Sequence, residues 1–214
     1  MADSTQFGAE ATDTVDVIMQ STYYVLLEHG YADLSIAKIA DKAGLSKSAL
    51  YNHYEGKNDL LLDFLSRFLE WYLDSPIDDT VEDPQAELQR LIDLLSVDSG
   101  GADSSTDSTL ETAAADAFVE LRAQAIHDES FRTELLREDE VIRTRLVQII
   151  QQGIDGGVFR DVDPEPVAEF ILTVLEGALF RSSLSDDGRE VAVYNRLNEY
   201  IQCHLILNTA RETP

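Results

Sequence analysis

The chain has 214 residues, 44% of them hydrophobic, which is enough for one compact domain or two small ones and excludes a disordered chain. It carries a formal net charge of −25 and a single cysteine, and no apolar run reaches the roughly 20 residues that a membrane span needs. The polar, acidic residues 1–14 lack the pattern of a signal peptide. We therefore expect a cytoplasmic protein without an intrachain disulfide or a membrane segment.

Apolar residues recur at helical spacing along almost the whole chain, and caps and stops are found at the expected ends. Ser35, Ser46 and Asp163 are suitable N-caps, whereas Gly30 and Gly44 are suitable stops. Helices are predicted at about 15–30, 36–44, 47–54, 57–75, 85–95, 110–126, 128–154, from 164 onward, and 188–208.

No stretch alternates in the way that a strand requires, and no internal repeat is found. The sequence therefore predicts an all-α protein of about nine helices. The segment 96–109 (SVDSGGADSSTDST) consists of serine, aspartate, glycine and threonine with almost nothing to bury, so we expect a mobile loop there.

Residues 35–54 hold two short helices joined by a tight turn at Gly44, the pattern of a helix-turn-helix. A helical wheel places on one side of the second helix the groups that suit phosphate and base-edge contacts: Lys47, Ser48, Tyr51 and Asn52. The other side holds the core residues Ala49, Leu50 and Tyr54, and the wheel places His53 with them.

All four lysines of the chain lie in this same window, from Lys38 to Lys57. Within residues 35–58 they are opposed only by Asp41 and Glu55, so the local balance is +2 in a chain that is otherwise strongly acidic. This clustering indicates an anion-binding surface, with chance grouping on a solvated face as the alternative. Because DNA presents a row of phosphates, it is the expected partner.

The window 36–60, IAKIADKAGLSKSALYNHYEGKNDL, resembles the signature of the TetR family of transcriptional regulators, and the similarity extends over about residues 14–62. The run Tyr51-x-His53-aromatic and the following Lys57 carry much of it. Asn52 departs from the family, which often has a larger or aromatic residue there, and Tyr54 replaces the commoner phenylalanine. The resemblance implies that DNA is contacted by Ser35, Lys38, Ser46, Lys47, Ser48, Ala49, Tyr51, Asn52, His53 and Lys57.

Beyond residue 62 the resemblance is looser, and it implies a helical domain that encloses an effector and pairs with a second copy. The domains are then a flexible tail at 1–13, a helix-turn-helix DNA-binding domain at 14–57, and an effector-binding and dimerisation domain at 58–214. Large side chains on core-facing helices are the pocket candidates: Phe64, Phe68, Trp71, Tyr72, Phe118 and Phe170. An aromatic stripe of this kind is more often ordinary core than a pocket. Few cations line these helices, which favours an apolar ligand.

The last helix is apolar on more than one side, which predicts two packing partners, with burial inside one monomer as the alternative. The expected dimer interface comprises Phe170, Val174, Ala178, Tyr194, Leu197, Ile201 and Leu205. The sequence therefore predicts a homodimeric repressor that an unknown small molecule releases from a palindromic operator. The alternative is a helical protein that has lost operator binding and acts through a protein partner.

Neither a metal site nor a cofactor site is expected, because the four histidines are scattered and no glycine-rich phosphate loop or nucleophile elbow is present. An enzyme is not expected either. The high acidity concerns habitat instead, because excess negative charge keeps proteins soluble in concentrated salt. It predicts a halophilic source, which we expect to be an archaeon, with a mesophilic protein that happens to be acidic as the alternative.

Overall fold

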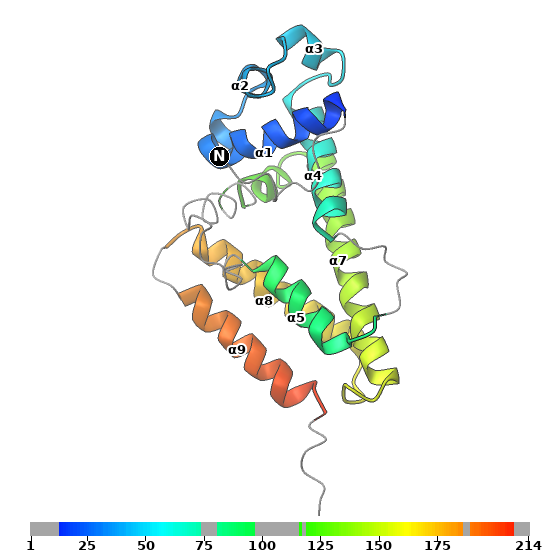
Figure 1. The fold of residues 1–214 in the computed structure, drawn as a ribbon. Helices are drawn as coiled ribbons and strands as arrows, with labels where there is room; N and C mark the ends of the chain where they lie inside the picture. Colours follow the sequence, from blue (N-terminus) through cyan, green and yellow to red (C-terminus); the bar gives the residue numbers. More distant parts are fainter. Residues whose placement is uncertain (1–12, 74–80, 97–115, 117–118, 186–188, 208–214) are drawn as a thin grey trace, which may run out of the picture. The chain divides into compact units, whose positions relative to one another are not determined.

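The computed structural model describes residues 13–73, 81–96, 116, 119–185 and 189–207 (Figure 1). Most of the predicted tail 1–13 and of the predicted loop 96–109 lies outside these residues, as does Phe118. The side chains of residues 68–73, among them Phe68, Trp71 and Tyr72, are not described either.

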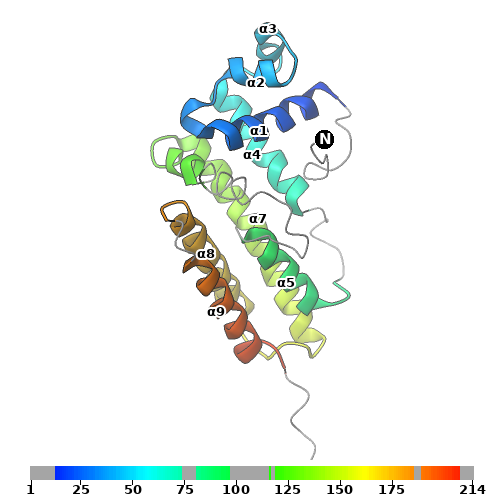
Figure 2. The same cartoon turned by 60° about the vertical axis from the view of Figure 1, so that its left-hand side comes forward.

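Helices account for most of the described chain (Figures 1 and 2). Residues 119–124 are also helical. The helices with defined bounds are α1 (Thr14–Asp33), α2 (Ile36–Lys42), α3 (Lys47–Tyr51), α4 (Lys57–Leu73), α5 (Pro84–Leu95), α7 (Glu129–Asp155), α8 (Pro164–Ser182) and α9 (Arg189–His204).

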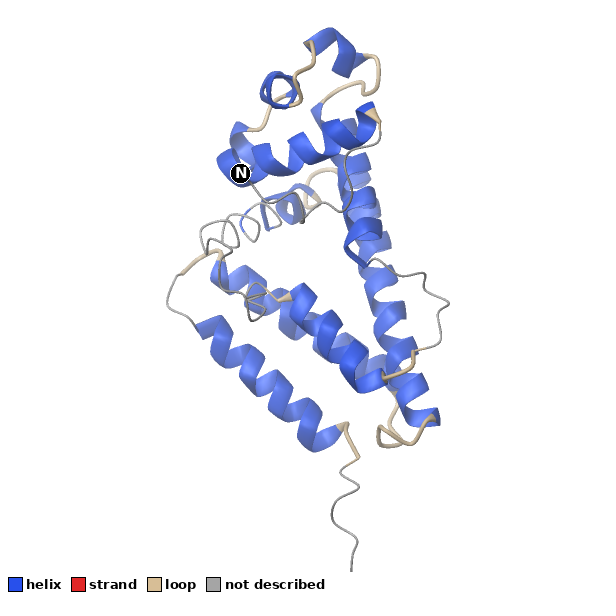
Figure 3. Ribbon diagram, in the orientation of Figure 1, coloured by secondary structure: helices blue, strands red, loops and turns tan. Residues whose placement is uncertain are grey.

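Within the described residues no strand is formed, and the one β-type contact is an isolated antiparallel bridge between Phe159 and Ile206 (Figure 3). This confirms the predicted all-α fold of about nine helices. None of the helices in the described ranges is long and apolar enough to cross a bilayer.

The predicted caps are in place because each lies within reach of the amides that its helix leaves free. The Oγ of Ser35 accepts from the Lys38 amide at 3.3 Å, and that of Ser46 accepts from the Ala49 amide at 3.1 Å. Asp163 accepts from the Glu165 amide at 3.3 Å. Gly44 adopts a φ of +66°, a left-handed conformation that lets the chain turn between α2 and α3.

The described residues divide into two compact units, the first drawn from Met1–Asp74 and Asp116–Glu138 and the second from Ser75–Ala115 and Asp139–Pro214. The first compact unit extends beyond the predicted domain boundary at residue 57. Leu60, Leu61 and Leu65 of α4 are buried in the same core as α1, α2 and α3, which is why this helix belongs to the first unit.

In the second unit α8 and α9 lie side by side in both views (Figures 1 and 2). The core of this unit is mainly aliphatic, with Leu91 of α5, Leu146 of α7, Ile171 of α8 and Leu197 of α9 all buried. The chain after α9 is held by hydrogen bonds from the Leu207 amide to the Val158 carbonyl and from the Arg160 amide to the Leu205 carbonyl.

Candidate nucleic-acid interface

The short helix α3 is anchored on one side and open on the other. Leu50 is fully buried in the core of the first unit, and Leu45, which precedes the cap, packs against the same core. The opposite side of α3 and the residues just after it are exposed: Lys47, Ser48, Tyr51, Asn52 and His53. The Tyr51 side chain has 57% of its surface accessible. α3 therefore presents its polar side to solvent.

His53 shows where helical periodicity fails near a helix end. The wheel placed His53 toward the core because it extended the helix to Tyr54, whereas α3 ends at Tyr51 with Asn52 as its C-cap. The His53 side chain is exposed, on the side that the family resemblance implied. Tyr54 is buried as predicted.

The remaining predicted contact residues lie around this surface but are less accessible. Ser35, Lys38 and Ala49 are half-buried, and the Ser46 hydroxyl is occupied as a cap. Lys42 forms an ion pair with Glu28 on α1 and lies 5.4 Å from the centre of the Tyr24 ring. No ion pair involves Lys38 or Lys47 among the residues that the structure describes.

Lys57 has a structural partner inside the chain. Its ammonium donates to the Tyr31 carbonyl at 2.6 Å and lies 3.9 Å from the centre of the Tyr31 ring. The Tyr31 amide in turn donates to Glu120. Burial lowers the pKa of Lys57, while the Glu120 carboxylate opposes this shift. The predicted phosphate ligand thus links the start of α4 to the end of α1.

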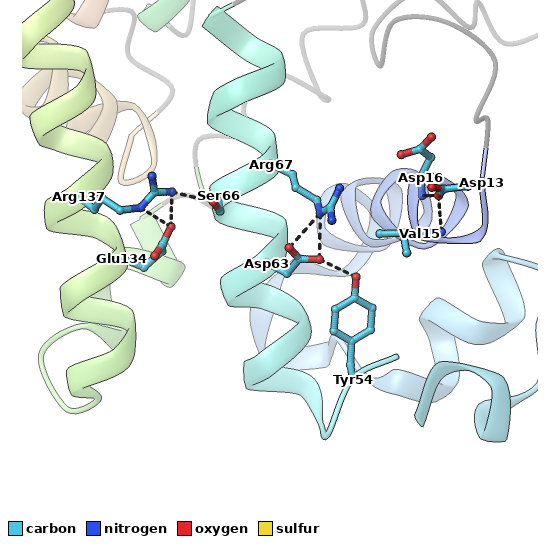
Figure 4. Close-up of polar contacts among 9 residues, drawn as sticks. All are labelled: Asp13, Val15, Asp16, Tyr54, Asp63, Ser66, Arg67, Glu134 and Arg137. Atoms are coloured by element: carbon cyan, nitrogen blue, oxygen red, sulfur yellow. Dashed lines mark hydrogen bonds and ion pairs between the residues drawn. The ribbon is translucent and has the colours of Figure 1, made fainter. Parts of the chain in front are cut away.

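A polar network absent from the sequence prediction holds the segment after α3 (Figure 4). The Tyr54 hydroxyl donates to Asp63 of α4 at 2.7 Å, and the Arg67 Nε donates to both oxygens of the same carboxylate at 2.9 and 3.0 Å. Asp63 and Arg67 are four residues apart on α4, a spacing that favours an ion pair and was the available signal in the sequence.

Removal of the Tyr54 hydroxyl is expected to change the response of stability to alkaline pH. Burial, and next the hydrogen bond to Asp63, raise the pKa of Tyr54. Because an unfolded tyrosine ionises near pH 10, the raised pKa gives stability that is complete below about pH 10 and is lost as the pH rises toward the folded value. Tyr54→Phe should cost about 1 kcal/mol at neutral pH and should then lose less stability than the wild type above about pH 10.

Urea unfolding at a series of pH values measures this effect. Tyr51→Phe, which changes an exposed ring on the neighbouring helix, is the matched control and should follow the wild type. Parallel alkaline profiles of the wild type and Tyr54→Phe would show that this hydroxyl has no linked role.

Of the predicted pocket residues, the structure describes the side chains of Phe64 and Phe170. Phe64 is buried in the core of the first unit. Phe170 lies on the surface of the second unit, where its ring contacts Tyr200 with centroids 4.8 Å apart. The other four candidates have side chains outside the described set. In the structure, the Phe64 side chain is therefore part of an ordinary core, and the Phe170 side chain is part of an exposed face.

Most of the predicted dimer residues take part in packing within the chain itself. The side chains of Tyr194, Leu197, Ile201, Leu205 and Ala178 are buried by the chain itself, and Val174 is half-buried. Of the predicted interface residues, Phe170 alone is exposed. A different stripe faces solvent, formed by four residues of α8 and by Leu184 in the turn after it, with spacings of three and four residues: Phe170, Thr173, Gly177, Phe180 and Leu184. The regular apolar stripe from Tyr194 to Leu205 thus packs in the chain's own core.

Comparison with known proteins assigns both parts of the chain. Residues 18–64 match the model of bacterial regulatory proteins of the tetR family, and residues 102–205 match that of the C-terminal domain of BetI-type transcriptional repressors. The transcriptional regulator BetI of Proteus mirabilis is 26% identical over 202 residues, covering 92% of this chain and 94% of that protein. The transcriptional repressor KstR2 of Mycolicibacterium smegmatis is 27% identical over 168 residues, 73% of each chain.

Solved structures agree with this assignment. A TetR transcription regulator from Haloarcula marismortui is 38% identical, with a TM-score of 0.76 over 90% of this chain and 98% of that one. A transcriptional regulator from Saccharomonospora viridis, crystallised with choline, is 19% identical with a TM-score of 0.73 over 91% and 98% of the two chains, a similarity of fold. The matches to family models and relatives agree with the exposed polar side of α3 and its buried Leu50. The chain belongs to the TetR family of transcriptional regulators.

Proposed function

We propose that this regulator is a homodimeric repressor that binds a palindromic operator through α3 and leaves it when a small ligand binds. The observation that carries the proposal is the division of α3 into a buried side, held by Leu50, and an exposed side of hydrogen-bonding and cationic groups. A helix of this kind fits the major groove, where side chains meet base edges and phosphates.

Lys47→Ala is expected to lower the affinity for operator DNA about tenfold and to reduce the slope of log affinity against log salt by about one, because one phosphate contact is lost. Fluorescence anisotropy with the promoter fragment beside the protein's own gene measures both quantities. Lys42→Ala is the matched control, since the Lys42 ammonium already pairs with Glu28. Equal losses in the two variants, or no specific complex at any salt concentration, would contradict the proposal.

The proposed partner in the dimer is a second copy seated on the exposed stripe of α8. Its ends are large apolar side chains, Phe170, Phe180 and Leu184, and Gly177 between them leaves open space where a Cβ would stand. A small residue flanked by large ones allows two helices to approach closely. Val191 of α9 adds another exposed apolar side chain to the second unit.

The proposed ligand is small and largely apolar, because the side chains buried in the second unit are mainly leucine, isoleucine, phenylalanine and alanine. We also infer a salt-rich cytoplasm in a halophilic archaeon. The 41 acidic residues against 16 basic ones support this inference, as does the 38% identity to the Haloarcula marismortui protein.

A further inference from the structure

Arg145 of α7 is a buried cation, and one buried nitrogen of its guanidinium group lacks a hydrogen-bond acceptor among the described residues. The residue is 5% exposed, and its Nη2 donates to Glu87 Oε1 of α5 at 3.0 Å. Its Nη1 is also buried, and no side chain or carbonyl among the described residues accepts a hydrogen bond from it. A buried donor without an acceptor is costly, and buried polar atoms nearly always have a partner. The position therefore calls for an acceptor.

The surroundings of Arg145 have the composition of a ligand site. Gln148, one turn further along α7, also has a buried amide oxygen without a hydrogen-bond partner in the described chain. Ile142 and Ile149 lie three residues before and four residues after Arg145, on the same face of the helix, and both are buried. A few polar groups on an apolar face are typical of small-molecule sites.

The charge at this position favours an anion. The Glu87 carboxylate also accepts from Arg90 at 2.9 Å, so one negative charge is shared between two guanidinium groups. Arg90, and next Arg145, lower the pKa of Glu87 against the opposing effect of burial. Arg143 on the same helix differs, because it pairs with both Glu140 and Glu165. Glu87 therefore neutralises Arg145 only in part.

We propose that Arg145 and Gln148 bind the carboxylate of an effector whose remaining part is apolar. One carboxylate oxygen accepts from Arg145 Nη1. A half-turn of the Gln148 amide brings its NH2 group to the buried position, where it donates to the second oxygen. The proposal rests on the ligand-released repressor proposed above and names the chemical class of its ligand.

Isothermal titration of the purified full chain tests the site directly. The probes are octanoate and phenylacetate, each paired with its uncharged alcohol, octan-1-ol and 2-phenylethanol, and choline as a cation. The wild type should bind at least one carboxylate about 10- to 100-fold more tightly than the matching alcohol, the range expected for a charged hydrogen bond. Tighter binding of choline or of the alcohols, or no binding of either carboxylate, would overturn the proposal.

Variants assign the preference to Arg145. Arg145→Met should abolish the difference in affinity between carboxylate and alcohol. Arg145→Lys keeps the positive charge and serves if Arg145→Met folds poorly; it should reduce this difference. Gln148→Leu should weaken the binding of the carboxylates and leave the binding of the alcohols unchanged. Arg143→Met removes a guanidinium from the same helix and should leave the preference intact; the same loss in this variant would refute the assignment.

Operator binding by the same preparations separates the two proposals. Carboxylate binding without any specific DNA complex would leave the ligand site standing and reject the repressor. A specific DNA complex without carboxylate binding would reject the ligand site alone.

Discussion

A Phe180→Glu variant is expected to sediment as a monomer of about 23.8 kDa, and the wild type is expected to sediment as a dimer. The Phe180 side chain is 52% exposed near the middle of the α8 stripe, between Gly177 and Leu184. In a dimer closed over this stripe, the glutamate would lose its hydration without gaining a partner, which costs several kcal/mol. Because a palindromic operator needs two α3 helices at once, operator affinity should fall by about 100-fold or more.

Leu136→Glu is the matched control for this variant. Leu136 is also an exposed apolar residue, but it belongs to α7 and to the first unit, not to the stripe. It should leave both the dimer and operator binding unchanged. A dimeric Phe180→Glu protein, or a monomeric wild type at the concentrations that bind DNA, would reject the α8 interface.

Gly153→Ala is expected to lower the free energy of unfolding by about 3 kcal/mol, at the upper end of the usual cost of overpacking a core. A Cβ on Gly153 would stand 2.1 Å from Cδ2 and 2.4 Å from Cε2 of Phe159. The Phe159 ring is buried and cannot turn outward. Its amide also donates to the Gly153 carbonyl at 2.9 Å, so the two backbones are held together and cannot easily separate.

Urea denaturation followed by circular dichroism measures this loss, with Gly56→Ala as the control. Gly56 has open space where a Cβ would stand, and its φ lies outside the left-handed range. Its replacement should change stability by about 1 kcal/mol or less. Similar losses in the two variants would show that the close approach to Phe159 is not the cause.

The helix-turn-helix could be predicted in detail because its determinants are local. Ser35 and Ser46 accept hydrogen bonds from amides three residues away. Gly44 forms the turn between α2 and α3 through its own left-handed φ. The polar side of α3 follows from the position of Leu50 by helix geometry alone. Interactions within one helical turn are visible in a sequence.

The partner of an apolar face could not be predicted in the same way. Periodicity shows that Tyr194 and Leu197 share a face, but their own chain and a second copy offer the same apolar environment. On α8 a rotation of about one residue separates the predicted Ala178 from the exposed Gly177. Long-range polar pairs have no local signal, and the sequence separation of 58 between Glu87 and Arg145 places that pair beyond any sequence pattern.

The grip on Tyr31 has a mechanical consequence for the first unit. Lys57 holds its carbonyl and Glu120 its amide, directly after the kink that Gly30 makes in α1 with a φ of +67°. The corner of α1 is thus clamped by α4 on one side and by residues 119–124 on the other. A displacement of residues 119–124 must either break the hydrogen bond between Glu120 and the Tyr31 amide or move the kinked end of α1. That end continues directly through Ser35 into α2. These two hydrogen bonds therefore couple the position of residues 119–124 to the chain that enters α2.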